Sequence, residues 1–172
     1  MNQKLTLAIQ KSGRLSEGTI ELLKLCGIKV SNGNNHLKAL AEGFPLEILL
    51  LRDDDIPQYV ADGVADIGIL GFNEVLEKKQ PVEVVKKLGF SKCKLSVAIP
   101  RSEEYTGKNY LQGKRIATSY PNILADFLKT NSINAEIHTI SGSVEINPGI
   151  GMDDALLENV SSGVTLLSNK LK

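Results

Sequence analysis

A short turn near the end of the sequence combines hydroxyl groups with a glycine, a composition suited to binding a phosphate. It runs over 158–165 (E-N-V-S-S-G-V-T), and a helix is expected to begin within it. The hydroxyls of Ser161, Ser162 and Thr165, with free backbone N–H groups and the helix dipole, would form an anion nest. Gly163 would let the backbone approach a phosphate closely. A capped helix after a polar turn has the same pattern, so both interpretations stay open.

Charged residues in two other places could act on the same kind of ligand. Asp154 and Glu158 are four residues apart, so on one helix face, or at its end, they could hold the ribose hydroxyls of a phosphoribosyl group. Lys11 and Arg14 lie in a glycine-containing turn and could neutralise a pyrophosphate or triphosphate. Taken alone, this second pair is better explained as a solvated basic turn.

Other polar groups have simpler explanations. The three acidic residues Asp53, Asp54 and Asp55 suit the first turn of a helix, which ranks above a Mg²⁺ site. Ser119 and His138 could be proposed as nucleophile and base, but no G-x-S-x-G elbow is present. The sequence contains neither a P-loop nor a G-x-G-x-x-G motif, so any nucleotide would be bound by another route.

Composition excludes several classes of protein. Lys plus Arg and Asp plus Glu number 20 each, and a nucleic-acid binder would usually carry a basic surplus. The N-terminus has neither a signal peptide nor a membrane anchor, so we expect a cytoplasmic protein. Cys26 and Cys93 are expected to be buried free thiols. Together with His36 and His138 they match no zinc pattern.

Apolar periodicity and turn residues divide the chain into alternating strands and helices. Strands are expected at 4–9, 46–51, 65–70, 82–88, 95–99, 114–118, 134–140 and near 159–160. Helices are expected at 17–26, 53–62, 73–79, 122–130, 152–157 and 162–168. This alternation indicates an α/β fold with parallel sheets. A polar stretch suggests that a second lobe begins near Cys93, giving lobes at 1–92 and 93–172 with a cleft between them.

Local signals also predict how some of these elements begin and end. Ser16 and Asp53 are expected to cap the first two helices, and Gly27 and Gly63 to close them in the left-handed conformation. The stretch 31–35 (S-N-G-N-N) is expected to form a hairpin tip.

Several stretches together resemble the catalytic subunits of ATP phosphoribosyltransferases, in order and in spacing, over essentially the whole chain. They are 10–15 (QKSGRL), 52–57 (RDDDIP), 62–71 (DGVADIGILG), 113–121 (GKRIATSYP), 141–145 (SGSVE) and 154–165 (DALLENVSSGVT). The opening QKSGRL is more similar to the long form of the family, which carries its own regulatory domain.

The resemblance implies a two-lobed fold like that of type II periplasmic binding proteins, with a central cleft. It implies that Lys11 and Arg14 are the catalytic residues, facing the phosphates of phosphoribosyl pyrophosphate across the cleft. The implied substrate-binding residues are Tyr120, Glu145, Asp154, Glu158, Ser161, Ser162, Gly163, Val164 and Thr165. Among them, the loop 158–165 would bind phosphoribosyl pyrophosphate. Asp154 and Glu158 would lie near its ribose.

The reaction implied by the resemblance is the first step of histidine biosynthesis. N1 of ATP attacks the anomeric carbon of phosphoribosyl pyrophosphate, and pyrophosphate leaves with the help of Mg²⁺, whose ligands the sequence does not identify. Family members assemble as dimers and hexamers, return to the first lobe with another strand, and in the long form add a histidine-binding domain. We therefore expect this chain to be a fragment that histidine does not inhibit and that is weakly active or inactive.

Two other functions stay open. One is a cytoplasmic nucleotide- or phosphate-binding module of the same fold without catalysis. The other is a solute-binding receptor, which would need a signal peptide or a tether.

Overall fold

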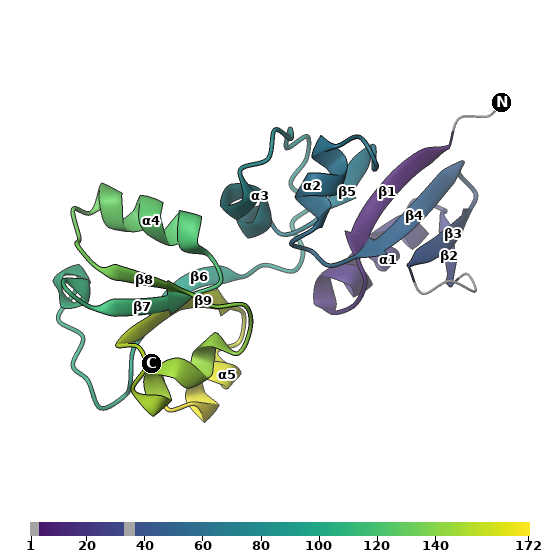
Figure 1. The fold of residues 1–172 in the computed structure, drawn as a ribbon. Helices are drawn as coiled ribbons and strands as arrows, with labels where there is room; N and C mark the ends of the chain where they lie inside the picture. Colours follow the sequence, from purple (N-terminus) through teal and green to yellow (C-terminus); the bar gives the residue numbers. More distant parts are fainter. Residues whose placement is uncertain (1–3, 33–36) are drawn as a thin grey trace. The chain divides into compact units, whose positions relative to one another are not determined.

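The computed structural model describes residues 4–32 and 37–172, and the chain divides into two compact units, Met1–Ser91 and Lys92–Lys172 (Figure 1). Each unit is built around its own sheet and its own hydrophobic clusters. The boundary expected from the sequence lies one residue further along the chain. The α/β architecture with two sheets agrees with the expected fold class, but the expectation of parallel sheets is wrong in part, because each sheet also contains antiparallel pairs.

The sheet of the first unit has the strand order β2-β3-β4-β1-β5. Its strands are β1 (Leu5–Gln10), β2 (Lys29–Asn32), β3 (Lys38–Glu42), β4 (Leu46–Leu51) and β5 (Ile67–Ile69). β1 runs parallel to both β4 and β5, whereas β3 is antiparallel to β2 and β4. The carboxyl ends of β1, β4 and β5 therefore meet at one edge of this sheet.

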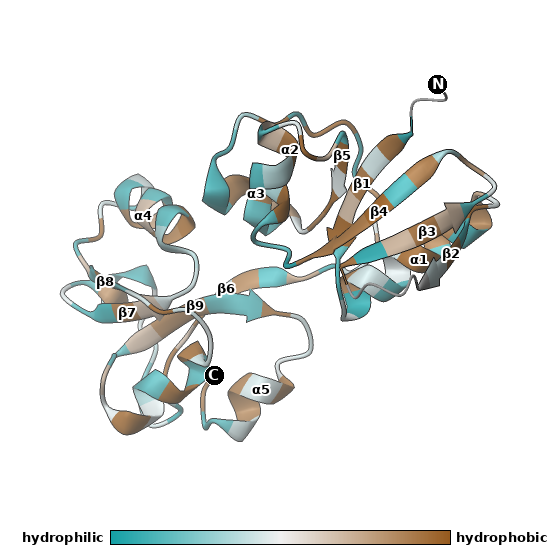
Figure 2. Ribbon diagram, turned by 45° about the vertical axis from the view of Figure 1, so that its right-hand side comes forward, coloured by the Kyte–Doolittle hydropathy of each residue, from teal (hydrophilic) through white to brown (hydrophobic). Residues whose placement is uncertain are grey.

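The helices of this unit are α1 (Arg14–Leu25), α2 (Ile56–Ala61) and α3 (Phe72–Lys78). Hydrophobic residues dominate β1 and β4, the strands that these helices help to cover (Figure 2). Because side chains alternate along a strand, Ile9 of β1 packs with Leu23 of α1, while neighbouring Ala8 packs with Ile56 of α2. Both faces of β1 are thus buried at these positions.

Gly68 of β5 is required by the close approach of α2. A Cβ at this position would lie 2.6 Å from Cγ2 of Ile56 and 3.1 Å from Cγ2 of Val60. We expect Gly68→Ala to lower the free energy of unfolding by about 1–3 kcal/mol, since the helix must shift to admit the methyl group. Denaturant unfolding measures this, with Gly149→Ala as control, because a Cβ at Gly149 meets no atom within 4 Å. Equal midpoints for the two variants would contradict the packing argument.

The sheet of the second unit has the strand order β6-β9-β7-β8. Its strands are β6 (Lys94–Ala98), β7 (Arg115–Thr118), β8 (Glu136–Thr139) and β9 (Ala155–Val160). β7 is parallel to β8 and β9, and β6 is antiparallel to β9. The carboxyl ends of β7, β8 and β9 consequently share one edge, and their amino ends share the opposite edge.

Helices cover both faces of this second sheet (Figure 1). α4 (Pro121–Thr130) packs through Leu124 on Ile116 and Leu157. On the other face lie the 3₁₀ helix η2 (Val144–Ile150) and α5 (Val164–Ser168), packed on Ala117 and Leu156. A further 3₁₀ helix, η1 (Lys108–Leu111), precedes β7.

Two of the expected elements are wrong. The segment 82–88, expected as a strand, has no regular structure, and nothing within 4–32 or 37–172 pairs with it. The expected helix at 152–157 is replaced by β9, which begins at Ala155. The apolar run 155–157 fits either a helix or a buried strand, and parallel pairing with β7 selects the strand.

Several local signals have mixed outcomes. Gly27 and Gly63 do end helices at positive φ (79° and 70°), as expected. Ser16 and Asp53 are not caps: α1 is preceded by Gly13 and α2 by Asp55, neither with a side-chain cap.

Two further predictions concern the cysteines and a hairpin. Cys26 and Cys93 are exposed, which contradicts the expected burial. The expected hairpin at 31–35 falls mostly outside the described residues, as does His36, although the flanking strands β2 and β3 are antiparallel. No helix in the described part of the chain is both long and apolar enough to span a membrane.

Candidate functional site

Three hydroxyl-rich turns follow the carboxyl ends of the parallel strands of the second unit. Ser119 follows β7, 141–143 (S-G-S) follows β8, and 161–163 (S-S-G) follows β9. Because these strand ends share one edge, side chains far apart in the sequence are brought to the same place. We call Ser119, Glu145, Glu158 and the turn 161–165 the carboxyl-edge site.

Glu158, near the end of β9, has a fixed carboxylate. Its Oε2 accepts a hydrogen bond from the Ser119 hydroxyl (3.1 Å), and its Oε1 accepts one from the Asn159 N–H (2.8 Å). Burial raises the pKa of Glu158, the two hydrogen bonds oppose that rise, and the negative charge of Glu145 adds to it. An oriented, partly desolvated carboxylate beside a second one suits a ligand that brings hydroxyl donors or a cation.

The turn after β9 exposes its backbone. Gly163 adopts φ 74°, in the left-handed region, and a Cβ there would meet no atom within 4 Å. Ser162, Val164 and Thr165 are exposed, and the first helical residues after Gly163 have N–H groups without intrahelical acceptors. The turn is therefore exposed to solvent, and its binding of a phosphate stays a prediction.

Tyr120 lies mostly in the core and not on an open surface. Its side chain belongs to the cluster of Ile116 and Leu124, and the residue is 8% exposed. Its N–H donates to the Thr118 hydroxyl (2.8 Å), which in turn donates to the carbonyl oxygen of Leu157 (2.9 Å). Tyr120 thus fixes the end of β7 beside β9, and little of it is accessible to a substrate.

Asp154 does not lie beside Glu158, so the expected pairing of these two carboxylates is wrong. The helix that would have aligned them is a strand, in which four residues span about 13 Å. Asp154 lies at the amino end of β9, where its carboxylate accepts hydrogen bonds from the Arg115 N–H (2.9 Å) and from Nζ of Lys114 (3.2 Å). The Arg115 N–H, together with Lys114, lowers the pKa of Asp154. Its role is to join β9 to β7.

We expect Asp154→Asn to lower stability mainly by removing these charged hydrogen bonds. A lowered folded-state pKa stabilises the fold above the ordinary carboxyl pKa, and that contribution disappears as the pH falls through the folded-state value. Because the side chain is 41% exposed, the loss should be about 1 kcal/mol or less. Unfolding midpoints measured from neutral to acid pH should converge for the variant and the parent. A constant difference at all pH values would contradict this.

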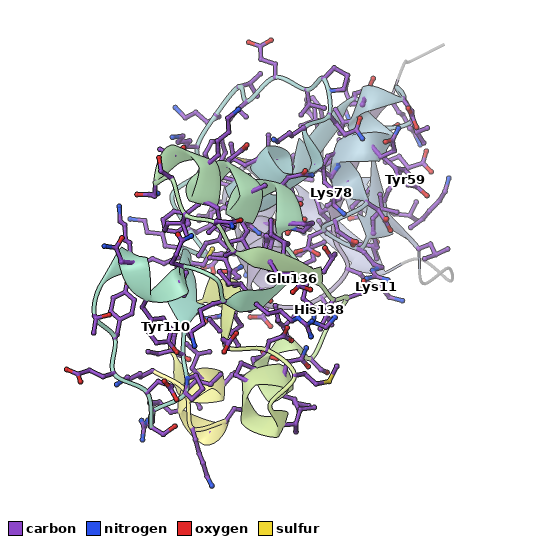
Figure 3. The ribbon with its side chains drawn as sticks, turned by 60° about the vertical axis from the view of Figure 1, so that its left-hand side comes forward. Lys11, Tyr59, Lys78, Tyr110, Glu136 and His138 are labelled. Atoms are coloured by element: carbon purple, nitrogen blue, oxygen red, sulfur yellow. The ribbon has the colours of Figure 1, made fainter. Side chains whose placement is uncertain are left out.

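Lys11 and Arg14, the expected catalytic residues, lie in the first unit, at the carboxyl end of β1 (Lys11 is labelled in Figure 3). Lys11 is exposed, and its N–H donates to the carbonyl oxygen of Leu51 (2.8 Å). Arg14 is the first residue of α1 and is also exposed. Both cationic side chains are thus exposed near the carboxyl end of β1, where a phosphate group could contact them.

The acidic run 53–55 forms ion pairs nearby in the same unit. Asp54 contacts Nε of Arg52 (3.3 Å) and Nζ of Lys78 (3.7 Å), and Asp53 accepts the Asp54 N–H. Within 4–32 and 37–172, no cluster of three or more His, Cys, Asp or Glu side chains could hold a metal ion.

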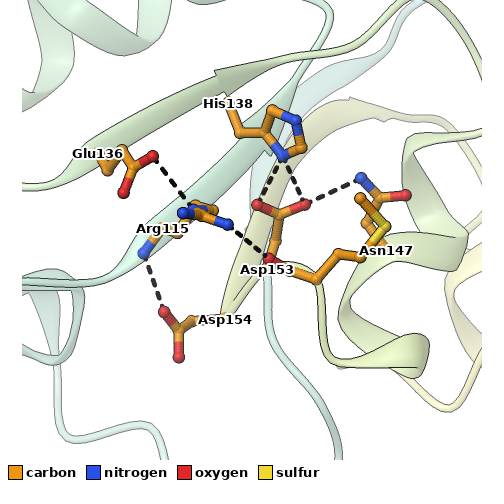
Figure 4. A network of polar contacts seen from close by, with 7 residues as sticks. Arg115, Glu136, His138, Asn147, Asp153 and Asp154 are labelled. Carbon is orange, nitrogen blue, oxygen red and sulfur yellow. Dashed lines mark hydrogen bonds and ion pairs between the residues drawn. The ribbon is translucent and has the colours of Figure 1, made fainter.

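A second polar region occupies the amino edge of the second sheet (Figure 4). It borders a cavity of about 480 Å³ and contains the ion pairs Arg115–Glu136 (3.2 Å) and Lys114–Asp154 (3.2 Å). Beside them, His138 contacts Asp153, which also binds Asn147. Asp153 and Asn147 were not predicted from the sequence, because no local motif marks a contact between residues on separate elements.

Comparison with known proteins agrees with the geometry. The family model HisG: ATP phosphoribosyltransferase matches residues 52–172. The ATP phosphoribosyltransferase of Cytophaga hutchinsonii is 62% identical over the whole chain, and that of Parabacteroides distasonis is 57% identical over 98% of it. The chain spans 60% and 59% of the lengths of these two relatives.

Solved structures give the same fold. A chain of the ATP phosphoribosyl transferase (HisG:HisZ) complex from Thermotoga maritima matches with a TM-score of 0.79 and 29% identity, over 98% of this chain and 80% of that one. An ancestral arginine-binding protein bound to arginine matches with a TM-score of 0.61 and 14% identity, over 100% and 78%, a likeness of fold alone. On the family match, which covers most of its length, the chain belongs to the ATP phosphoribosyltransferase family.

Proposed function

We propose that the chain is the catalytic part of an enzyme that transfers the phosphoribosyl group of phosphoribosyl pyrophosphate to N1 of ATP, the first step of histidine biosynthesis. Membership of the family supports this activity. The single structural observation that carries it is the meeting of Glu158, Glu145 and the open turn at Gly163 on one sheet edge. Such a site offers acceptors for ribose hydroxyls beside donors for a phosphate.

The carboxyl-edge site would hold the phosphoribosyl group in one orientation. The N–H groups and hydroxyls of 161–165 would bind the 5′-phosphate, because oriented backbone donors favour an anion. Glu158, held by Ser119, would accept hydrogen bonds from ribose hydroxyls, with Glu145 beside it. Lys11 and Arg14 of the first unit would neutralise the leaving pyrophosphate.

Mg²⁺ fits this proposal as an ion carried largely by the substrate. Mg²⁺ usually keeps several waters and binds one or two carboxylates together with substrate phosphates. Glu158 on β9 and Glu145 on η2 would be the carboxylates available for this at the carboxyl edge. When bound, the ion would offset negative charge on the departing pyrophosphate.

The protein residues would act by position and charge. The transition state of such a transfer is oxocarbenium-like, so it gains most from fixed reactants and a stabilised leaving group. The oriented Glu158 carboxylate would hold the ribose, while Lys11 and Arg14 would neutralise the charge of the leaving pyrophosphate. We assign no general base.

The proposal extends to the state of the enzyme. We propose a cytoplasmic homo-oligomer that acts on ATP and phosphoribosyl pyrophosphate and binds neither nucleic acid nor membrane. The Thermotoga maritima relative was solved in a complex with HisZ. Light scattering after size-exclusion chromatography would test self-association, and a monomer at all concentrations would contradict it.

Formation of phosphoribosyl-ATP is the deciding measurement. Purified protein is mixed with ATP and phosphoribosyl pyrophosphate, with and without Mg²⁺, and the product is followed by absorbance. Weak turnover that requires Mg²⁺ is expected from this chain. Binding of either substrate without turnover by the complete enzyme would favour the non-catalytic phosphate-binding module instead.

A further inference from the structure

A buried side-chain network ties η2 to the sheet (Figure 4). The Asp153 side chain is 0% exposed and both its oxygens accept hydrogen bonds. Nδ1 of His138 lies 2.8 and 3.0 Å from the two oxygens, and Nδ2 of Asn147 donates to one of them (2.9 Å). These residues come from β8, from η2 and from the segment just before β9, so one carboxylate joins three parts of the unit.

The element that this network fixes also carries Glu145. η2 is a 3₁₀ helix, whose backbone hydrogen bonds are weaker than those of an α-helix, and it is bounded by Ser143 and Gly151 at positive φ. Two of its side chains hold it in place: Val144 packs in an apolar cluster, and Asn147 binds Asp153. Glu145 lies between these two anchors. It follows Val144, which shares a cluster with Leu156, two residues before Glu158 on β9. The negative charge of Glu145 contributes to the raised pKa of Glu158.

We propose that Asp153 and Asn147 are positioning residues for the carboxyl-edge site. They would hold η2 so that the Glu145 carboxylate stays beside Glu158 and the bound ribose. This inference rests on the proposed function, because Glu145 meets a ribose only if phosphoribosyl pyrophosphate binds there. Residues that orient a ligand-binding group are commonly worth about 10- to 100-fold in affinity or activity.

Asn147→Leu is the principal test, because leucine has nearly the same size and cannot donate to Asp153. The His138–Asp153 contact remains in this variant. We expect the KM for phosphoribosyl pyrophosphate to rise about tenfold while the KM for ATP stays unchanged. A loss of folded protein alone would lower the apparent kcat and leave both KM values as they were, which would overturn the proposal.

A conservative variant separates geometry from charge. In Asp153→Asn, the amide oxygen can still accept from Asn147, and the amide nitrogen can donate to the other tautomer of His138. The network is then kept without its charge, so we expect substrate KM values within about threefold of the parent. A rise as large as that in Asn147→Leu would show that charge, and not position, is the requirement.

A double-mutant cycle tests whether the effect passes through Glu145. We expect Glu145→Gln to raise the KM for phosphoribosyl pyrophosphate about tenfold and Asn147→Leu to add little to it, whereas independent effects would multiply to about 100-fold. Glu136→Gln is the control, since Glu136 is an exposed partner of Arg115 and belongs neither to η2 nor to the Asp153 network. If the parent enzyme does not bind phosphoribosyl pyrophosphate, the proposed function fails; if it binds and the effects multiply, only this inference fails.

Discussion

Gly163→Val is expected to abolish measurable binding of phosphoribosyl pyrophosphate. Gly163 has φ 74°, a conformation that a β-branched residue adopts only with strain of about 1–3 kcal/mol. The turn should therefore change shape and lose its donors to the phosphate. Since each hydrogen bond to a charged group contributes about 1.5–3 kcal/mol, the loss of two such bonds weakens binding by at least about 100-fold. Isothermal titration with phosphoribosyl pyrophosphate measures this.

Gly163→Asn separates the two causes of that loss. Asparagine tolerates the left-handed conformation, and a Cβ at this position meets no atom within 4 Å, so the turn should keep its shape. If the phosphate lies against the backbone, the added side chain still weakens binding while the unfolding temperature stays near that of the parent. Unchanged affinity in the valine variant would show that the phosphate binds elsewhere.

The sequence predicted elements well where local patterns and packing agree. The strand 46–51 appears with the same bounds, and α4 differs from its expected start by one residue. Gly27 and Gly63 mark helix ends because glycine, which has no Cβ, adopts the left-handed conformation at no steric cost.

The misplacements have a common physical cause. The run 155–157 is apolar, and only pairing with β7 makes it a strand, so Asp154 was assigned to the wrong end of the sheet. The segment 82–88 was expected to be a strand, but Val85 is 79% exposed and pairs with no described segment. Long-range pairing, which no local window contains, decides both cases.

The candidate site was predictable in part. Glu158 and the turn 161–165 form one continuous motif, and the structure places them together at the carboxyl edge. Ser119 was considered only as a nucleophile, whereas its hydroxyl donates to Glu158. That contact joins β7 to β9 across 39 residues of sequence, and it follows from strand order, which the sequence did not specify.

Glu158→Gln is expected to weaken the binding of phosphoribosyl pyrophosphate without destabilising the fold. Desolvation raises the pKa of Glu158, so its ionised form disfavours the folded state, and stability falls as the pH rises from the ordinary value through the folded-state value. The neutral glutamine avoids that loss. At neutral pH we therefore expect an unfolding temperature equal to or above that of the parent, with affinity reduced by about 10-fold or more.

Asp154→Asn provides the opposite case on the same strand. Its carboxylate is stabilised by the Arg115 N–H and Lys114, so the amide should lower stability slightly and leave substrate affinity unchanged. Together the two variants test which acidic residue of β9 serves the ligand and which serves the fold. The ionised Glu158 carboxylate lowers the stability of the fold, and such a destabilising residue is typically retained for function. A Glu158→Gln protein that is less stable than the parent and binds phosphoribosyl pyrophosphate normally would reverse the assignment.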